Sequence, residues 1–314
     1  MSGHGRKHPE SRCVSKNERR VLTDTPADTV RGIAFAIAAY VIWTLGDTAA
    51  KWVLPVTGVA LAMFWRGVVG ALAVGVVAAA TPGASVGRML RPVRWGLIAV
   101  RGLMSSAVSI MWYIAWGRMS LIDTYVVAFT APLIMTLLAI PMLGERLRPR
   151  RLVATLVGFG GVLVILHPDG DLWQPVVALL LLAIVLMSIT RIMTRQLSTT
   201  ETPECQAFWL MISHTVSGLA ILWWFPPIAP MTTATWVCLV FLGIASGTAH
   251  CANARAYGLA PVSALAPYEY TMLIWGGIAG YLVFAELPSL STLAGGAIIA
   301  GAGLYNLHRE RRAR

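Results

Sequence analysis

The feature that most constrains this chain is a succession of ten apolar segments, each about as long as a membrane-spanning helix. An α-helix rises 1.5 Å per residue, so roughly 20 apolar residues cross the hydrocarbon core of a bilayer. Short connections, often marked by proline or glycine as in Thr81-Pro82-Gly83, separate the segments. The segments cover residues 31–54, 58–80, 95–116, 120–143, 150–167, 174–196, 205–225, 235–256, 262–285 and 290–307. We therefore predict an all-α integral membrane protein with ten transmembrane helices.

The composition supports this prediction. Of the 314 residues, 57% are hydrophobic and 12% are charged, whereas a soluble domain carries about 25% charged residues. Too few polar side chains are present to cover a soluble globule of this size. The connections are also too short to hold a separate soluble domain.

The formal net charge of +11 comes from arginines and lysines that lie between the apolar segments and in the two tails. This pattern sets membrane topology and does not predict a nucleic-acid partner. With the amino terminus in the cytoplasm, the clusters 88–94, 146–151 and 309–314 all face inward, and an even number of helices returns the carboxyl terminus to that side. We predict a multi-pass protein of the plasma membrane (the bacterial inner membrane) with both termini cytoplasmic.

The four cysteines, Cys13, Cys205, Cys238 and Cys251, have no C-x-x-C spacing. They favour free thiols over a disulfide framework or a zinc site, so we expect no metal and no cofactor. Residues 1–29 are polar and basic and lack the apolar core of a signal peptide. They are predicted to form a disordered cytoplasmic tail.

An internal repeat relates the two halves of the chain. A shift of 141 residues places Gly102 on Gly243 and Ser105 on Ser246, and a shift of 144 places Phe64-Trp65 on Phe208-Trp209. A repeat of five helices crosses the membrane an odd number of times, so the second copy is inverted, and transporters of this kind bind substrate near the midplane between the repeats. The expected units are the tail 1–29, the repeats 30–168 and 172–307, and a basic cytoplasmic tail 308–314.

Several short motifs in this order resemble the EamA type of the drug/metabolite transporter superfamily. In the first half they are Arg101-Gly102 through Trp116-Gly117, Ala131-Pro132-Leu133 and Leu143-Gly144-Glu145-Arg146-Leu147; in the second, Ala256-Tyr257-Gly258, Ala266-Pro267-Tyr268-Glu269-Tyr270 and Phe284-Ala285-Glu286-Leu287. The resemblance implies two inverted five-helix repeats around a central cavity. The stretch around Glu269 is similar to S-adenosylmethionine uptake carriers, but related branches carry amino acids, amines, carboxylates and riboflavin. The resemblance therefore leaves the substrate open.

Ionisable side chains inside a membrane are costly and should face a cavity or a partner. One set is expected near the outer third of the bilayer: Asp47, Lys51, Arg66 and Asp123. Asp47 and Lys51 are four residues apart and share a helix face. This set forms either an ion-pair network that seals the outer end or an outer gate whose pairs break on opening.

A second set is expected near the inner third: Arg101, Arg191, Arg255 and Glu269. Arg101 and Glu269 lie at similar depth, and we expect them to pair across the repeat interface in a cavity. Arg191 and Arg255 are close enough to the cytoplasmic face to snorkel, and Arg191 is kept with the gating or ion-pair residues.

Aromatic and polar residues complete the candidate cavity. The aromatic candidates are Trp43, Trp112, Tyr113, Tyr125, Tyr268, Tyr270 and Trp275. We expect Trp112 in an interfacial belt and Tyr268 or Tyr270 in the pocket. His214, His250 and Asn253 are predicted to bond neighbouring helices, with proton coupling through His250 or Glu269 as the alternative, and Glu145 and Glu286 to be structural. The predicted cavity set is Arg101, Glu269, Tyr268, Tyr270, Asn253, His250 and Tyr125.

These observations favour a secondary transporter that moves a small metabolite by alternating access, with an amino-acid-like or carboxylate-bearing substrate. The alternatives are a membrane-embedded transferase and a structural or sensory membrane protein. An enzyme needs a cluster of catalytic side chains near the interface, and no such set stands out, so we predict no catalytic residues. The glycine-rich stretches 158–161 and 295–303 suit close helix packing or a homodimer.

Overall fold

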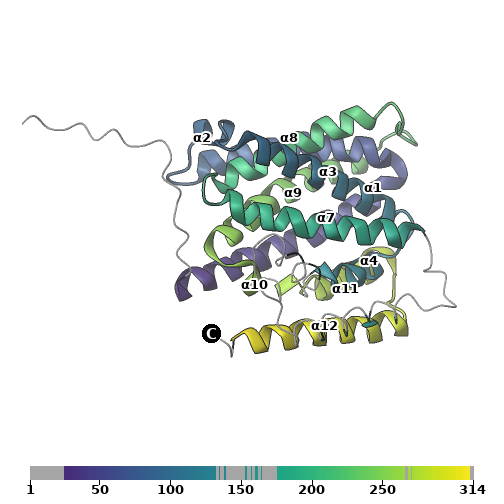
Figure 1. Ribbon diagram of the computed structural model, residues 1–314. Helices are drawn as coiled ribbons and strands as arrows, with labels where there is room; N and C mark the ends of the chain where they lie inside the picture. The colour runs from purple at the N-terminus through teal and green to yellow at the C-terminus, as the bar shows by residue number, and fades with distance from the viewer. Residues whose placement is uncertain are drawn as a thin grey trace, which may run out of the picture.

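A computed structural model describes residues 25–131, 175–265, 268–269 and 271–311, together with 134, 138, 153, 157, 160, 161 and 164. Figure 1 shows the long helices packed side by side, with their connections at the two ends of the bundle. The described helices are α1 (Pro26–Ala80), α2 (Val86–Leu90), α3 (Trp95–Trp116), α4 (Leu121–Ala128), α7 (Pro175–Leu197), α8 (Pro203–Ile221), α9 (Thr233–Leu259), α10 (Val262–Leu265), α11 (Thr271–Phe284) and α12 (Leu290–Arg311).

The 55-residue α1 is two helices joined at Gly58, whose φ of 65° is readily adopted only by glycine. Both halves pack against α9. Gly32 and Gly46 approach Ala260 and Ala245, whereas Gly70 approaches Gly243 and Gly247. The first half therefore runs antiparallel to α9 and the second half turns back, as the predicted segments 31–54 and 58–80 require.

Hydroxyl side chains begin several of the helices. Thr25, Ser120, Thr202 and Thr232 each accept a hydrogen bond from the backbone N–H three residues later. Such a cap satisfies a donor that the first helical turn leaves free. Glu201, just before α8, also accepts hydrogen bonds of 2.7–3.2 Å from the N–H groups of Val93 and Arg94. This link ties the start of α3 to the start of α8.

Close backbone approach holds the centre of the bundle together. A Cβ atom at Gly67 would lie 2.3 Å from Oγ1 of Thr215, and one at Gly218 would lie 2.4 Å from the backbone nitrogen of Phe64. Only glycine permits these contacts between α1 and α8. Small residues let helices in lipid come close enough for extensive van der Waals contact.

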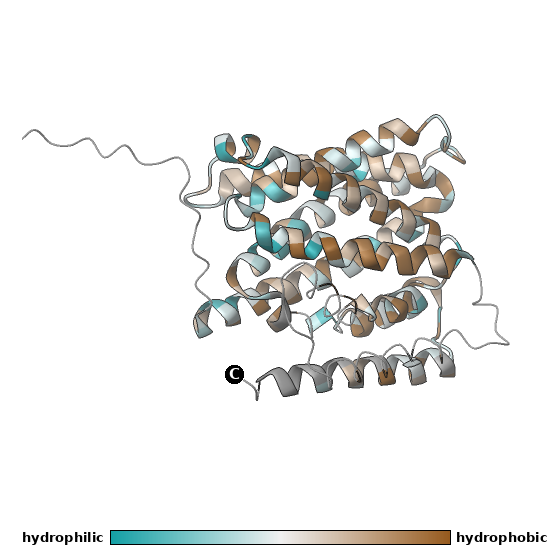
Figure 2. Ribbon diagram, in the orientation of Figure 1, coloured by the Kyte–Doolittle hydropathy of each residue, from teal (hydrophilic) through white to brown (hydrophobic). Residues whose placement is uncertain are grey.

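The outer surface of the bundle is apolar. By length and composition, α1, α3, α7 and α9 are each able to cross a membrane. Large hydrophobic side chains such as Leu72, Val76, Leu103 and Leu282 are exposed, and Figure 2 shows long hydrophobic stretches along these helices, with hydrophilic residues gathered at the C-terminal end of α7. An apolar surface of this extent requires lipid contact.

Two predicted helices differ from the structure. The segment 262–285 is not one span: α10 ends at Leu265, a short turn holds Tyr268 and Glu269, and α11 begins at Thr271. Pro267 in the sequence has no N–H to donate, which disfavours a continuous helix. At the other end, α12 continues to Arg311, so part of the expected tail 308–314 is helical. The predicted helix 150–167 and Glu145 lie largely or wholly outside the described residues, as does most of the amino-terminal tail.

Candidate binding cavity

A cavity of about 140 Å³ lies inside the bundle, between helices from both halves of the chain. Its wall combines buried charges with aromatic rings. The lining residues are Trp43, Asp47, Arg66, Arg101, Ser105, Val108, Ser109, Trp112, Tyr113, Trp116, Tyr125, Ala128, Phe129, Met187, Thr190, Arg191, Thr194, Leu210, His214, His250, Asn253, Glu269 and Met272.

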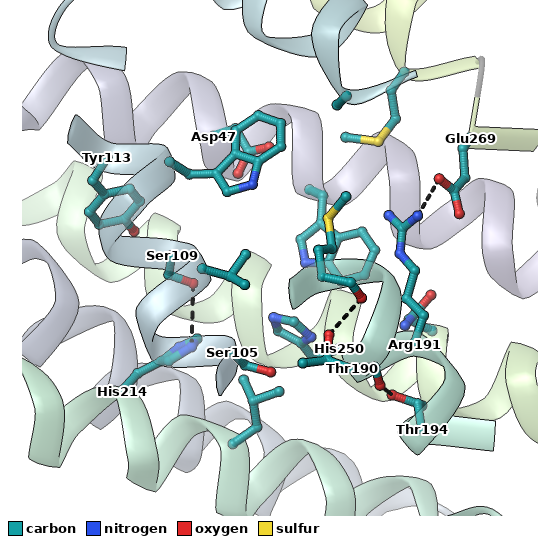
Figure 3. A pocket seen from close by; sticks show the side chains of 18 of the residues that line it. Asp47, Ser105, Ser109, Tyr113, Thr190, Arg191, Thr194, His214, His250 and Glu269 are labelled. Atoms are coloured by element: carbon teal, nitrogen blue, oxygen red, sulfur yellow. Dashed lines mark hydrogen bonds and ion pairs between the residues drawn. The ribbon is translucent and has the colours of Figure 1, made fainter. Parts of the chain in front are cut away.

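One side of the cavity holds an ion pair between Arg191 of α7 and Glu269 in the turn before α11. Figure 3 shows this pair facing Asp47 and Tyr113 across the cavity. Both partners are buried, and the hydroxyl of Tyr40 lies 3.4 Å from the Glu269 carboxylate as a second donor. The break between α10 and α11 is what presents Glu269 to α7.

Arg101 of α3 does not pair with Glu269, contrary to the sequence-based expectation. Its Nε donates to Oγ1 of Thr194 at 2.9 Å and its Nη1 to the carbonyl of Gln206 at 3.2 Å. Arg191 occupies the place expected for Arg101. Depth along a helix gives the level of a side chain but not the direction in which it points. The expected snorkelling of Arg191 is therefore also wrong, because Arg191 is only 8% exposed.

The opposite side of the cavity contains Asp47 and Arg66, from the two halves of α1. The Tyr125 hydroxyl donates to the Asp47 carboxylate at 2.8 Å. Arg66 donates from Nη1 to Ser109 at 3.3 Å and to the Tyr113 hydroxyl at 3.2 Å. Arg66 and Asp47 are close enough for their charges to interact, yet no ion pair joins them.

The predicted outer ion-pair network is not formed as one unit. Lys51 and Asp123 do not line the cavity. Lys51 pairs with Glu286 and donates to the Met119 carbonyl at 3.0 Å. Asp123 accepts from Thr292 at 2.7 Å. Each charge has its own partner, because the side chains leave α1 and α4 toward different neighbours.

Glu286 has the structural role predicted for it. Besides pairing with Lys51, its carboxylate accepts a hydrogen bond of 2.9 Å from the N–H of Leu121. It thereby joins the end of α11 to the start of α4.

Two histidines lie at the base of the cavity. Nε2 of His214 lies 3.4 Å from Oγ of Ser109, which is the helix-to-helix contact expected from the sequence. The ring of His250 packs edge-on against Trp43 and lies 6.2 Å from the ring of His214. Nδ1 of His214 and Nε2 of His250 are buried without a hydrogen-bond partner in the described part of the chain. Asn253 also faces the cavity.

Several aromatic and basic candidates lie elsewhere than expected. Trp112 is buried in the cavity wall rather than in an interfacial belt, because α4 covers this face of α3. Tyr268 packs near Tyr40 outside the cavity wall. Arg255 pairs with Glu204, and its Nη2 donates to Thr81 at 3.1 Å. Tyr270 lies outside the described residues.

A polar stripe on α3 was not predicted from the sequence. Arg101, Ser105, Ser109 and Tyr113 recur every four residues and all line the cavity. Residues four apart share one face of a helix, so this spacing was the available signal.

The cavity provides cations, hydroxyls and aromatic rings without a metal-binding cluster. Within the described ranges, no group of three or more His, Cys, Asp or Glu side chains is placed to hold an ion.

A bundle of apolar helices that encloses charged and aromatic side chains defines a polytopic membrane protein with an internal cavity. The chain belongs to the EamA-like transporter family, whose pattern matches residues 30–167 and again 174–307.

Relatives within this family are named as transporters. The chain is 28% identical to a riboflavin transporter of Brucella anthropi over 71% of this chain and 80% of that protein. It is 27% identical to an S-adenosylmethionine uptake transporter of Rickettsia bellii over 68% of this chain and 73% of that one. A crystal structure with 21% sequence identity superposes with a TM-score of 0.62, covering 92% of this chain and 99% of that chain, which supports the fold.

Proposed function

We propose that this protein is a secondary transporter that carries a small metabolite across the bacterial inner membrane by alternating access. Its fold is proposed to be ten transmembrane helices in two inverted five-helix repeats, 30–168 and 172–307, with both terminal tails in the cytoplasm. The cavity would hold the solute, and the ion pairs and hydrogen bonds around it would separate as the protein changes the side to which it opens.

The observation that carries this proposal is the set of five charged side chains around one interior cavity: Asp47, Arg66, Arg101, Arg191 and Glu269. Burial of such groups in a membrane is expensive by roughly 2.5–3.5 kcal/mol each on insertion scales. They are far more costly than an apolar core would be. A water-accessible path for a polar solute would explain why these charged side chains lie inside the bundle.

Equivalent contacts in the two halves support the inverted repeat. Asp47 and Tyr125 are 78 residues apart, as are Arg191 and Glu269. A shift of 144 residues converts the first pair into the second. An inverted repeat would set these two pairs at opposite depths, as an outer and an inner closure of the same cavity.

A reciprocal contact between helices gives further support. A Cβ atom at Gly102 would lie 2.9 Å from Cβ of Ser213, and one at Gly243 would lie 2.4 Å from Cβ of Val69. The shift of 141 relates the two glycines, and the shift of 144 relates Val69 to Ser213. A two-fold relation between repeats produces such matched contacts.

Counterflow into vesicles tests the proposal. The purified full-length protein is reconstituted and supplied with S-adenosylmethionine, riboflavin, amino acids and carboxylates, because relatives named for the first two share this family. The expected result is saturable uptake of at least one solute that an internal pool of the same solute accelerates. Arg101→Gln is expected to abolish uptake while membrane insertion is retained. Absence of counterflow for every solute in the panel would contradict a carrier. Uptake into protein-free vesicles at the same rate as into vesicles that hold the wild-type protein would also contradict it.

A further inference from the structure

The cavity carries more positive than negative charge. Three arginines and two carboxylates face it. Glu269 is occupied by Arg191, whereas neither Arg66 nor Arg101 lies within ion-pair distance of a carboxylate in the described part of the chain. One positive charge is therefore left without a counterion inside the protein. A bound monoanion would balance it.

The two arginines without an ion-pair partner, Arg66 and Arg101, lie along one polar surface. Arg101 lies one helical turn from Ser105 on α3, and Arg66 bonds Ser109 one turn further along. Each four-residue step is about 6 Å of helix rise. Both arginines line the same cavity as His214 and His250. Figure 3 places Ser105 and Ser109 at the floor of this cavity, beside the two histidines.

Two residues that line this cavity have unused hydrogen-bonding groups. Arg66 is 6% exposed, and its Nε has no partner. Nε2 of His250 is likewise buried without one. Buried polar groups are normally hydrogen-bonded, so each exception needs an explanation, and a ligand that binds there would provide one. A carboxylate accepts several hydrogen bonds at once, and arginine matches its geometry with two parallel donors.

Aromatic rings surround the rest of the cavity. Trp43, Trp112, Tyr125 and Phe129 line it, and they provide flat apolar walls for stacking. The volume of about 140 Å³ is close to that of a cavity that holds benzene, about 150 Å³. In this conformation the cavity accommodates one ring-sized group rather than a large solute.

We propose that Arg66 and Arg101, with Ser105 and Ser109, form an anion subsite that receives the carboxylate of a solute whose single aromatic ring lies against the tryptophans. This inference rests on the proposed function for its physiological meaning and specifies the substrate class. An aromatic monocarboxylate matches both the surplus charge and the ring-sized space. An uncharged aromatic compound would leave the surplus positive charge without a counterion.

Matched pairs of small probes test the subsite directly. Benzoate and benzamide, and nicotinate and nicotinamide, have nearly the same shape and differ in the carboxylate. Their dissociation constants are measured with the full-length protein in nanodiscs, by thermal shift and by saturation-transfer NMR. The carboxylates are expected to bind roughly tenfold or more tightly than the amides, since one charge-assisted hydrogen bond is worth about that factor. Equal binding of acid and amide, or no binding by either, overturns the subsite.

Arginine variants show which side chains cause the preference for the carboxylate. Arg66→Gln and Arg101→Gln are each expected to remove most of the preference for the carboxylate, whereas Arg118→Gln, an identical change at an exposed loop position, leaves it intact. If a glutamine variant does not fold, Arg66→Lys and Arg101→Lys keep the charge and are expected to reduce the preference without abolishing it. A full preference in all folded variants of both arginines overturns the assignment.

The binding assay is independent of transport. Selective benzoate binding without counterflow of any solute would leave the subsite standing and remove the carrier function. Counterflow without a preference for carboxylates would support the carrier function and overturn the subsite.

Discussion

Arg191 and Glu269 form an ion pair that is buried on both sides, with side chains only 10% and 6% exposed to solvent. The pair joins α7 to the turn between α10 and α11, and the hydroxyl of Tyr40 adds a donor from α1. Three separate parts of the chain therefore meet at one carboxylate. Any motion that opens this side of the cavity has to provide both charges with new partners.

Removal of the Glu269 charge should destabilise the protein strongly. Glu269→Gln leaves the buried Arg191 without a counterion, and breaking such a pair from one side costs about 3–5 kcal/mol. Thermal unfolding in detergent is expected to show a clear drop in the midpoint. Glu286→Gln is the matched control, because the Glu286 side chain is 22% exposed and its pair is better screened. Equal midpoints for wild type and Glu269→Gln would contradict the prediction.

Exchanging the two charges of this ion pair provides a second test of their coupling. In the double variant Arg191→Glu with Glu269→Arg, the charges are exchanged but remain complementary. Its midpoint is expected to lie above those of both single reversals. A double variant no more stable than the single ones would show that the two side chains are not coupled.

Close packing between α1 and α8 should not tolerate even one added methyl group at Gly67. Its Cβ atom would lie 2.3 Å from Oγ1 and 2.4 Å from the backbone nitrogen of Thr215. Since the backbone cannot move away cheaply, Gly67→Ala is expected to lose about 1–3 kcal/mol or more. Gly75→Ala on the same helix has open space around the new Cβ and should be neutral or slightly stabilising. The yield of monodisperse protein and the unfolding midpoint distinguish the two, and similar behaviour of both variants would refute this packing.

The sequence was sufficient to predict helices and insufficient to predict partners. Apolar length divided α1 between residues 54 and 58, next to the turn that the structure has at Gly58, and distance from the segment ends gave Arg101 and Glu269 a similar expected depth. Depth could not reveal that Arg191, rather than Arg101, faces Glu269, because that choice depends on the rotation of α3 and α7 about their axes. Rotation is set by packing among several helices, and no local pattern records it.

The internal repeat also relates contacts that residue types alone do not reveal. The shift of 144 residues that aligns Phe64-Trp65 with Phe208-Trp209 also aligns Asp47 with Arg191 and Tyr125 with Glu269. These matched positions carry different chemistry, an acid with a phenol in one half and a base with an acid in the other. A comparison of residue types alone therefore overlooks them, and only the contacts reveal the correspondence.

Accessibility labelling should reveal the proposed orientation. In a background without Cys13, Cys205, Cys238 and Cys251, single cysteines are introduced at Arg118 and at Arg88, both of which are exposed. An impermeant maleimide added to intact cells is expected to label position 118 and not position 88, because basic clusters remain cytoplasmic. Lysis should expose both positions. Labelling of position 88 alone in intact cells would reverse the orientation.

The hydrogen bond between Tyr125 and Asp47 should affect transport as well as stability. Tyr125→Phe removes the hydroxyl that donates to Asp47 at 2.8 Å but keeps the ring that packs against Gly276 of α11. The stability cost is about 1.5–3 kcal/mol, as for a bond to a charged group. Because this pair corresponds to Arg191 and Glu269 in the other half, its loss should weaken one closure of the cavity and alter the rate of exchange across the membrane. Tyr257→Phe is the control, since that buried hydroxyl has no hydrogen-bond partner among the described residues. Counterflow rates that change in the first variant and not in the second would support paired closures, and unchanged rates in Tyr125→Phe would show that the bond only holds α1 against α4.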